Sequence, residues 1–203
     1  MSPPTVTIVM TGVANVASVS AAVRRRGGLV RLATGPAEVE SAEFLVLPGV
    51  GAFAEGMAAL RSLGLIDPIR RRVEADRPTL AICLGMQLLC VSSEESPGVE
   101  GLGVIEARVM ALANPPRPRF GWNMVSPTPQ CRQLTAGYAY YANSFGLRNT
   151  PAGWNAATSE LGAPFIAGLE RGRVVACQFH PELSGTWGAG LISRWMQQEA
   201  VPC

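Results

Sequence analysis

The sequence predicts an α/β fold in which helices flank a mostly parallel central sheet with antiparallel additions. Its first half alternates continuous apolar runs of strand length with helical patterns, and its second half holds short strand-like pieces between glycines and prolines. Continuous apolar runs suit parallel strands buried on both faces, and strands that alternate with helices imply a parallel sheet. Because 203 residues suffice for one substantial core, we predict a single domain over residues 1–203.

The first half of the chain supplies the predicted parallel strands. The strand candidates are the apolar runs at 6–10 and 44–47, the buried strand predicted at 79–82 and the segment at 29–33, which can form a second strand. A helical pattern with Val16, Val19 and Val23 follows the first run, and further helices are predicted at 53–63 and 68–75. Successive strands of this kind bring their carboxyl ends to one edge of the sheet, where open α/β sheets build their sites.

The second half of the chain predicts mixed or antiparallel strands. Prolines punctuate it at Pro115, Pro116, Pro118, Pro127 and Pro129. Runs at 165–169 and 174–179 flank the segment Glu170-Arg171-Gly172-Arg173, which predicts a hairpin with glycine in its turn. His180 then falls just past a strand end, and a helix over 191–198 closes the chain.

Composition excludes several kinds of mechanism and partner. The sequence contains no lysine, so all 17 basic residues are arginine, and Schiff-base or P-loop lysine chemistry is excluded. The net charge is +2, and the arginines at 24–26 lie at a predicted helix end, where they suit the helix dipole better than a nucleic-acid site. No apolar run approaches the roughly 18 residues of a membrane helix, and the N-terminus lacks signal-peptide features. We expect a cytoplasmic protein without membrane or nucleic-acid partners.

The cysteines and the histidine limit the chemistry further. The five cysteines are Cys83, Cys90, Cys131, Cys177 and Cys203, and they lack the paired spacing of a zinc site or a secreted disulfide framework. We expect most of them to be reduced and structural, and we expect no metal and no cofactor. His180 is the only histidine, so it must act in any mechanism that needs an imidazole, unless a partner chain supplies one.

Cys83 lies at a predicted turn from a buried strand into a helix. Ala81 and Gly85 stand two residues to either side, small enough to let the two backbones approach as in a nucleophile elbow. The positive end of the helix dipole favours a thiolate there. A buried structural cysteine is the alternative that the turn alone leaves open.

The segment His180-Pro181-Glu182 adds a base and a carboxylate after another strand. Residues two apart in an extended segment point the same way, so Glu182 can orient the ring of His180 and stabilise its charged form. His180 can then take a proton from Cys83 and deliver one to a leaving amine. The sequence therefore predicts a Cys83-His180-Glu182 triad.

A glycine-rich loop at 47–53 directly follows the strand at 44–47. Glycines let backbone N–H groups approach a ligand closely, and acyl transfer needs donors aimed at the developing oxyanion. We predict the amides of Leu84 and of Val50 or Gly51 as these donors. An ordinary turn is the alternative reading of this loop.

These residues resemble the class I glutamine amidotransferases, and among them the glutaminase subunits of imidazole glycerol phosphate synthase. The cysteine elbow and the His-Pro-Glu segment are typical of the superfamily, and Pro48 to Phe53, Met86 to Leu89 and Gly121-Trp122-Asn123 are typical of these subunits. The matching segments are Gly12 to Asn15, Leu47 to Phe53, Ile82 to Leu89, Ser93 to Glu95, Gly101 to Gly103, Gly121 to Asn123, Tyr140 to Phe145 and Gln178 to Glu182. The resemblance runs nearly end to end and implies a flavodoxin-like amidotransferase domain.

The resemblance also implies a reaction and a partner. Cys83 would attack the side-chain amide of glutamine, and the ammonia released would pass to a separate (βα)8-barrel cyclase subunit in a heterodimer for histidine biosynthesis. By position, Gly51, Gln87, Glu95, Asn143, Ser144 and Phe145 would line the glutamine pocket. Asn15, Trp122 and Tyr140 would lie toward the cyclase.

The sequence departs from the family pattern at several positions. Ala81 stands where the elbow usually has glycine, and Ala14 changes the loop after the first strand. Asn143 and Phe145 replace a frequent histidine and tyrosine in the pocket. Leu183 replaces a lysine and removes a charge from the partner side, and Arg119-Phe120 replaces a more familiar His-Met.

Three other functions remain open at this point. The chain could be the glutaminase subunit of anthranilate or aminodeoxychorismate synthase, although those relatives lack the Gly-Trp-Asn segment. It could be a non-catalytic regulatory or scaffold subunit, which the intact triad argues against. It could also be a cysteine hydrolase or stress protein with a similar elbow, but such a protein would not require His-Pro-Glu.

Overall fold

The computed structural model describes residues 2–12, 15–112, 119–160 and 163–198. The strands are β1 (Thr5–Val9), β2 (Leu29–Ala33), β3 (Phe44–Gly49), β4 (Thr79–Cys83), β5 (Cys90–Ser93), β6 (Ile105–Ala111), β7 (Arg119–Pro127), β8 (Gly137–Asn143), β9 (Phe145–Gly146), β10 (Asn155–Glu160), β11 (Pro164–Arg171) and β12 (Val174–Cys177). The helices are α1 (Val16–Arg25), α2 (Pro36–Ser41), α3 (Phe53–Ser62), α4 (Ile66–Glu74), α5 (Leu84–Leu88), the 3-10 turn η1 (Pro181–Leu183) and α6 (Gly185–Met196).

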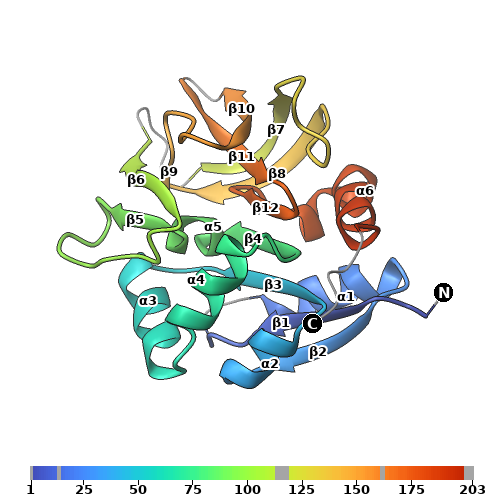
Figure 1. Ribbon diagram of the computed structural model, residues 1–203. Helices are drawn as coiled ribbons and strands as arrows, with labels where there is room; N and C mark the ends of the chain where they lie inside the picture. The colour runs from blue at the N-terminus through green and yellow to red at the C-terminus, as the bar shows by residue number, and fades with distance from the viewer. Residues whose placement is uncertain (1, 13–14, 113–118, 161–162, 199–203) are drawn as a thin grey trace.

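One large sheet carries both halves of the fold (Figure 1). Its described strands run in the order β2-β1-β3-β4-β12-β11-β10-β7-β8. The strands from β2 to β12 are parallel, and those from β12 to β8 pair antiparallel. The predicted fold class, a mostly parallel sheet with antiparallel additions, is therefore confirmed.

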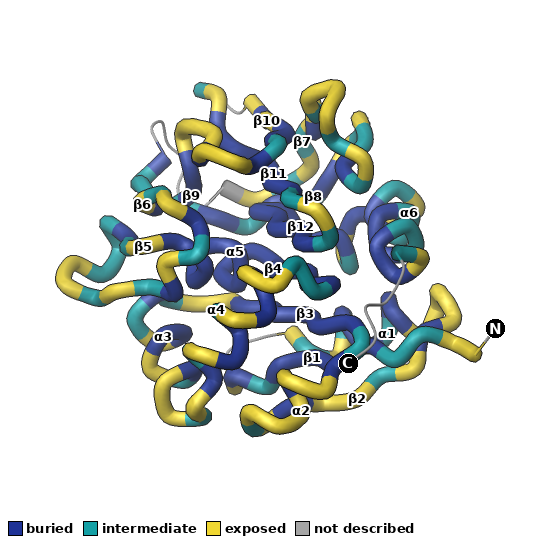
Figure 2. Tube along the Cα trace, in the orientation of Figure 1, coloured by how far each residue is buried: buried dark blue, intermediate teal, exposed yellow. Residues whose placement is uncertain are grey.

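Helices cover the two faces of the parallel half. Residues of α2, α3, α4 and α5 pack with Leu45, Leu47 and Ala81 on one face. Residues of α1 and α6 pack with Val46 and Ile82 on the other face. Figure 2 shows the result: β3, β4 and β12 are buried throughout, whereas the exposed stretches lie in loops, on the outer sides of helices and on the edge strand β2. Strands buried on both faces explain the continuous apolar runs in the sequence.

Several element boundaries differ from the prediction. α6 begins at Gly185 rather than 191, since glycines in its first two turns weaken the helical pattern. β12 ends at Cys177 rather than 179, because the chain leaves the sheet there to reach β8. The short helix α2 was not predicted. The predicted hairpin is confirmed between β11 and β12, with Gly172 in its turn at φ 53°.

Some predicted features fall on residues that the structure does not describe. These are Val13 and Ala14 of the segment Gly12 to Asn15, the prolines at 115, 116 and 118, and Cys203. The prediction of a single domain over residues 1–203 stays a prediction. None of the helices within the described ranges is both long and apolar enough to cross a membrane.

Candidate active site

Cys83 occupies a strained turn at the centre of the sheet. It ends β4 and precedes α5, with φ 53° and ψ −109°. A non-glycine residue at positive φ is uncommon and costs backbone energy. The turn is possible because Gly85 has no side chain: a Cβ there would overlap the carbonyl oxygen of Leu47 on β3. The sequence prediction of a tight strand-to-helix turn at Cys83 matches this geometry.

A cavity of about 240 Å³ opens beside Cys83. Its volume is below the roughly 300–1,000 Å³ of pockets that hold drug-sized ligands, so it suits a small substrate. The lining residues are Val50, Gly51, Cys83, Leu84, Gln87, Glu95, Ala142, Asn143, Ser144, Phe145 and His180. The structure thus brings together the predicted catalytic, oxyanion and glutamine-binding residues except Glu182, and adds Ala142, which the sequence analysis did not name.

His180 and Glu182 form a buried pair at this cavity. His180 Nδ1 lies 2.9 Å from Glu182 Oε1, and their side chains are 6% and 2% exposed. Burial lowers the pKa of His180, but the hydrogen bonds and charges of Cys83 and Glu182 raise it by more, to about 10. The ring therefore carries a proton at neutral pH and can donate it to a leaving group.

The main chain of His180 is tied to β8. Its N–H donates to the carbonyl of Tyr140 at 2.9 Å, and its carbonyl accepts from the hydroxyl of Ser184 at 2.6 Å. The same hydroxyl accepts from the N–H of Tyr140 at 2.9 Å. His180 is therefore held by the antiparallel half of the sheet, whereas Cys83 is held by the parallel half.

Gln178 contacts the nucleophile and was missed as a site residue. Its Nε2 donates to Cys83 Sγ at 3.6 Å, and its Oε1 accepts from Gln87 Nε2 at 3.0 Å. Gln87 Nε2 also donates to the carbonyl of Phe145 at 3.1 Å. Gln178 is fully buried. The available signal was its place two residues before His180, because residues two apart in an extended segment face the same way.

The predicted glutamine-binding residues differ in whether their polar atoms already have hydrogen-bond partners within the protein. Glu95 Oε2 accepts the N–H of Phe53 at 2.8 Å and so caps α3. Asn143 Nδ2 donates to the carbonyl of Phe145 at 3.0 Å, while its buried Oδ1 has no partner among the described residues. Ser144 and Phe145 line the cavity. Asn143 Oδ1 is thus a buried acceptor at the cavity residue Asn143 that has no partner in the described part of the chain.

The predicted oxyanion donors line the same cavity as Cys83. Leu84 follows Cys83 directly in the sequence, and Val50 and Gly51 are among the other lining residues. Gly51 has φ 96°, a conformation that L side chains rarely adopt. The assignment of these three amides as oxyanion donors stays a prediction.

The predicted partner-facing residues lie in two places. Asn15 caps α1 by accepting the N–H of Ser18 at 3.2 Å. Trp122 and Tyr140 pack edge to face, with ring centroids 6.2 Å apart. Exposed apolar side chains gather around this ring pair on β7, β8 and η1, namely Phe120, Trp122, Met124, Tyr138 and Leu183. We call these five residues the apolar docking surface.

Comparisons with known proteins show the family of the chain. The family model "Glutamine amidotransferase class-I" matches residues 14–196. Imidazole glycerol phosphate synthase subunit HisH of Symbiobacterium thermophilum is 38% identical over 196 residues, which cover 94% of this chain and 92% of that protein. The corresponding subunit of Deinococcus radiodurans is 37% identical, with 97% and 95% of the two chains covered.

Solved structures support the fold. A crystal structure of a glutamine amidotransferase superposes with a TM-score of 0.76 at 21% identity and covers 94% of this chain and 96% of its own. PurLQS from Thermotoga maritima contains a chain that superposes with a TM-score of 0.71 at 17% identity, covering 96% and 97%. Because both identities are low, these structures show the fold alone. The sequence relatives carry the assignment: the chain belongs to the class I glutamine amidotransferases and, within them, to the family of the imidazole glycerol phosphate synthase subunit HisH.

Proposed function

We propose that Cys83, His180 and Glu182 hydrolyse glutamine to glutamate and ammonia, and that the ammonia is passed to a cyclase subunit. The proposal rests mainly on one observation: His180, which forms a buried pair with Glu182, lines the same small cavity as Cys83. Cys83 itself lies on the strained turn between β4 and α5. Nucleophile, base and orienting carboxylate are the three parts that acyl transfer requires.

The proposed reaction has two steps. Cys83 Sγ, its proton transferred to His180, attacks the amide carbon of glutamine, and the backbone amides of Leu84 and of Val50 or Gly51 stabilise the oxyanion. His180 gives its proton to the leaving nitrogen, so that ammonia departs and a glutamyl thioester remains. Water then loses a proton to His180 and attacks the thioester, which releases glutamate and regenerates the thiol.

The proposed pocket holds glutamine by its polar ends. Asn143 Oδ1 can accept the α-amino group, because it is buried without a partner in the described part of the chain. Gln87, Glu95, Ser144, Phe145 and Gly51 complete the lining. Asn143 and Phe145 thus take the places of the more frequent histidine and tyrosine without closing the cavity.

The proposed partner is the (βα)8-barrel cyclase of imidazole glycerol phosphate synthase, bound as a heterodimer. The relatives are named as subunits of that synthase. A longer Arabidopsis thaliana chain, imidazole glycerol phosphate synthase hisHF, is 37% identical to this chain over 34% of its own length. The apolar docking surface lies next to His180, and it offers an uncharged contact area because Leu183 stands where a lysine is common.

We also propose a location and a form of control. The four described cysteines, Cys83, Cys90, Cys131 and Cys177, are free thiols, which suits the reducing cytoplasm. Glutamine hydrolysis is proposed to be low in the isolated chain and to rise when the cyclase and its nucleotide ligand are bound, through reorientation of the Gly49-Val50-Gly51 backbone.

A Cys83→Ala variant tests the division of labour. In complex with the cyclase, it is expected to abolish glutamine-dependent synthesis while leaving ammonia-dependent synthesis intact, because only the nucleophile is lost. The measurement is product formation by the wild-type and variant complexes with either nitrogen source. Loss of both activities would refute the proposal, as would glutamate release by the variant at the wild-type rate.

A further inference from the structure

Ser184 lies at the N-cap position of α6, but its side chain does not form the hydrogen bond that is usual there. It precedes the first residue of α6, where a serine side chain ordinarily accepts an N–H from the first turn of the helix. Within the described chain the Ser184 side chain makes no such bond. Its hydroxyl instead donates to the carbonyl of His180 at 2.6 Å and accepts the N–H of Tyr140 at 2.9 Å. The residue is 1% exposed, so both bonds are shielded from water.

These two bonds close a ring between the catalytic base and β8. The N–H of His180 donates to the carbonyl of Tyr140, and Ser184 links the carbonyl of His180 back to the N–H of Tyr140. Both main-chain polar groups of each residue are therefore committed to this ring. A displacement of β8 at Tyr140 must move the main chain of His180 or break a buried hydrogen bond, which is costly.

The outer side of the ring belongs to the apolar docking surface. The Tyr140 ring packs against Trp122, and the edge of the Trp122 indole lies 3.7 Å from the place of a Cβ on Gly185. Leu183, on the other side of Ser184, is exposed. A partner that covers Leu183 and Trp122 therefore contacts one sequence neighbour of Ser184 directly, and it contacts the other neighbour, Gly185, through the Trp122 indole.

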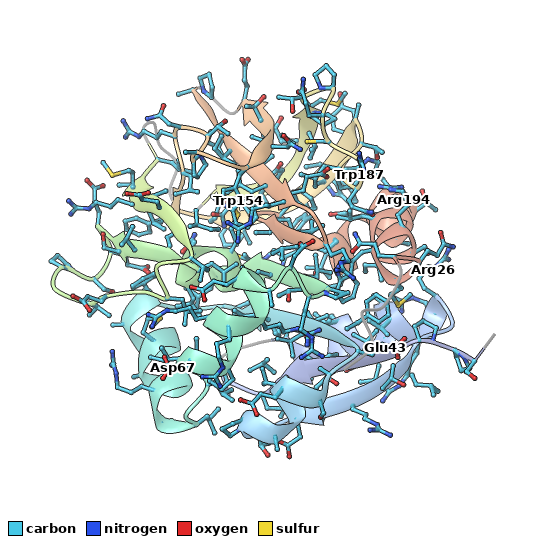
Figure 3. The ribbon with its side chains drawn as sticks, in the orientation of Figure 1. Arg26, Glu43, Asp67, Trp154, Trp187 and Arg194 are labelled. Carbon is cyan, nitrogen blue, oxygen red and sulfur yellow. The ribbon has the colours of Figure 1, made fainter. Side chains whose placement is uncertain are left out.

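The inner side of the ring is packed too tightly to absorb such a displacement. Gly188 on α6 approaches the segment so closely that a Cβ there would overlap the carbonyl of Pro181 and lie 2.7 Å from the Cβ of Ser184. α6 is in turn fixed to the segment before β8, because Trp187 Nε1 donates to the carbonyl of Ala136 at 3.0 Å and Arg194 donates to the carbonyl of Gln133. Figure 3 labels the Trp187 and Arg194 side chains at α6. Close-packed contacts of this kind transmit strain.

We propose that Ser184 is a positioning residue that couples partner docking to the catalytic base. It ties His180 to the strand that carries the docking surface, so that binding of the cyclase sets where the imidazole stands relative to Cys83 Sγ. The inference rests on the proposed function, because it assumes that the cyclase binds the apolar docking surface. Ser184 touches no substrate atom and acts only through His180.

The test compares Ser184→Ala with Ser184→Thr in complex with the cyclase and its nucleotide ligand. S184A removes both hydrogen bonds and is expected to lower the stimulated kcat for glutamate release about tenfold. The KM for glutamine should stay unchanged, because no cavity residue is altered. The ratio of stimulated to unstimulated activity should fall as well. S184T keeps the hydroxyl and should retain most of the kcat.

A matched control separates coupling from general destabilisation. Ser159 is also buried, and its hydroxyl donates to the carbonyl of Met124 on β7 at 2.6 Å, but it has no bond to His180. S159A should lose a comparable amount of thermal stability and keep the stimulated kcat. If S184A melts too early to assay, Ser184→Cys replaces it, because a thiol nearly fills the space of the hydroxyl but forms only weak hydrogen bonds; the proposal then requires S184C to lose activation while S159A retains it.

Three outcomes would overturn the inference. One is an S184A complex with the wild-type kcat and activation ratio. Another is an equal loss in S184A and S184T, which would assign the effect to packing. The third is an equal loss in S184A and S159A. A wild-type chain that releases no glutamate with the cyclase present would instead refute the proposed function, so the two failures are distinguishable.

Discussion

His180 is expected to titrate far from the ordinary range of an imidazole. Free histidine has a pKa near 6.5, and contact with Cys83 and Glu182 raises that of His180 to about 10 against the opposing effect of burial. A raised pKa in the folded state stabilises the protein fully below about pH 6.5, and this contribution is lost as the pH rises through about 10. The imidazolium of His180 is thus expected to contribute to the stability of the site in addition to its proposed role as proton donor.

A Glu182→Gln variant tests this assignment. Gln keeps a hydrogen-bond acceptor for His180 Nδ1 but removes the charge, so the pKa of His180 should fall and the variant should be less stable than the wild type at pH 6. The difference in unfolding free energy should shrink as the pH approaches 10. Urea unfolding at several pH values measures it, and NMR follows the titration without overlap because His180 is the only histidine.

An unchanged His180 pKa in E182Q would contradict the assigned role of Glu182. Glu170→Gln is a poor control, because that carboxylate is bonded to backbone amides. Glu38→Gln is better, since Glu38 is exposed on α2 and should leave the titration of His180 as it is.

Gln178 is expected to support the nucleophile rather than bind substrate. Replacing it by alanine removes the donor to Cys83 Sγ and the acceptor of Gln87. We expect kcat for glutamate release to fall by about ten- to a hundredfold, because a hydrogen bond to a charged group contributes about 1.5–3 kcal/mol. Steady-state kinetics of the complex with the cyclase measures this, with Gln130→Ala in an exposed loop as the control. A wild-type kcat in Q178A would show that the contact with sulfur is incidental.

At the scale of an element, the elbow depends on Gly85. A Gly85→Ala substitution places a Cβ on the carbonyl oxygen of Leu47, so α5 and β3 must separate and Cys83 must shift. We expect a loss of about 1–3 kcal/mol in the free energy of unfolding and loss of glutamate release. Chemical unfolding and the glutaminase assay check the two effects.

Gly190 on α6 provides the matched control for this substitution. A Cβ there would meet only the end of the Arg194 side chain, which can move aside. Gly190→Ala should therefore leave activity unchanged and stabilise the protein by up to about 1 kcal/mol, because alanine favours a helix interior. If G85A behaved like G190A, the close approach of α5 to β3 would not be what shapes the elbow.

The sequence predicted those elements whose pattern is local. The strands β2, β3 and β4 are apolar runs bounded by Gly or Pro, and their predicted bounds agree with the structure to within two residues. α6 was placed too late because glycines hide its start, and α2 has only six residues, too few for a helical period to show.

The sequence predicted which residues line the candidate site, but it did not predict all the hydrogen bonds that position them. Cys83, His180 and the loop with Val50 and Gly51 were identified from turn chemistry and spacing, and the structure gathers them in one cavity. The roles of Ser184 and Gln178 were not predicted, because each depends on a partner far away in the chain. A serine before a helix predicts a cap, and only the tertiary structure shows that its hydroxyl accepts the N–H of Tyr140, 44 residues earlier, instead.

At the scale of the whole molecule, we expect the apolar docking surface to contribute most of the binding free energy for the cyclase, with Trp122 as its main anchor. Trp122 is 55% exposed, and a Trp122→Ala change should weaken binding of the cyclase by about 2 kcal/mol, roughly thirtyfold, as is typical of buried aromatic anchors in interfaces. Titration calorimetry with the cyclase measures this. The stability of the isolated chain should change little, because the side chain already faces solvent.

Leu29 gives the matched control for the docking prediction. It is 54% exposed, but it lies on β2 at the opposite edge of the sheet from β8. Leu29→Ala should leave the affinity for the cyclase unchanged. Equal weakening by both substitutions would mean that the cyclase does not distinguish the two edges, and the proposed interface would be wrong.

The place of β12 in the sheet has a consequence for synthesis of the protein. β12 lies between β4 and β11, and Gln178 just beyond it bonds to Cys83, 95 residues earlier in the sequence. On the ribosome, β4 therefore emerges long before the strand that covers its edge, and such late, distant pairing slows folding and leaves an apolar edge open. Because His180 follows that last strand, the proposed pair of Cys83 and His180 cannot assemble until the end of the domain has been synthesised.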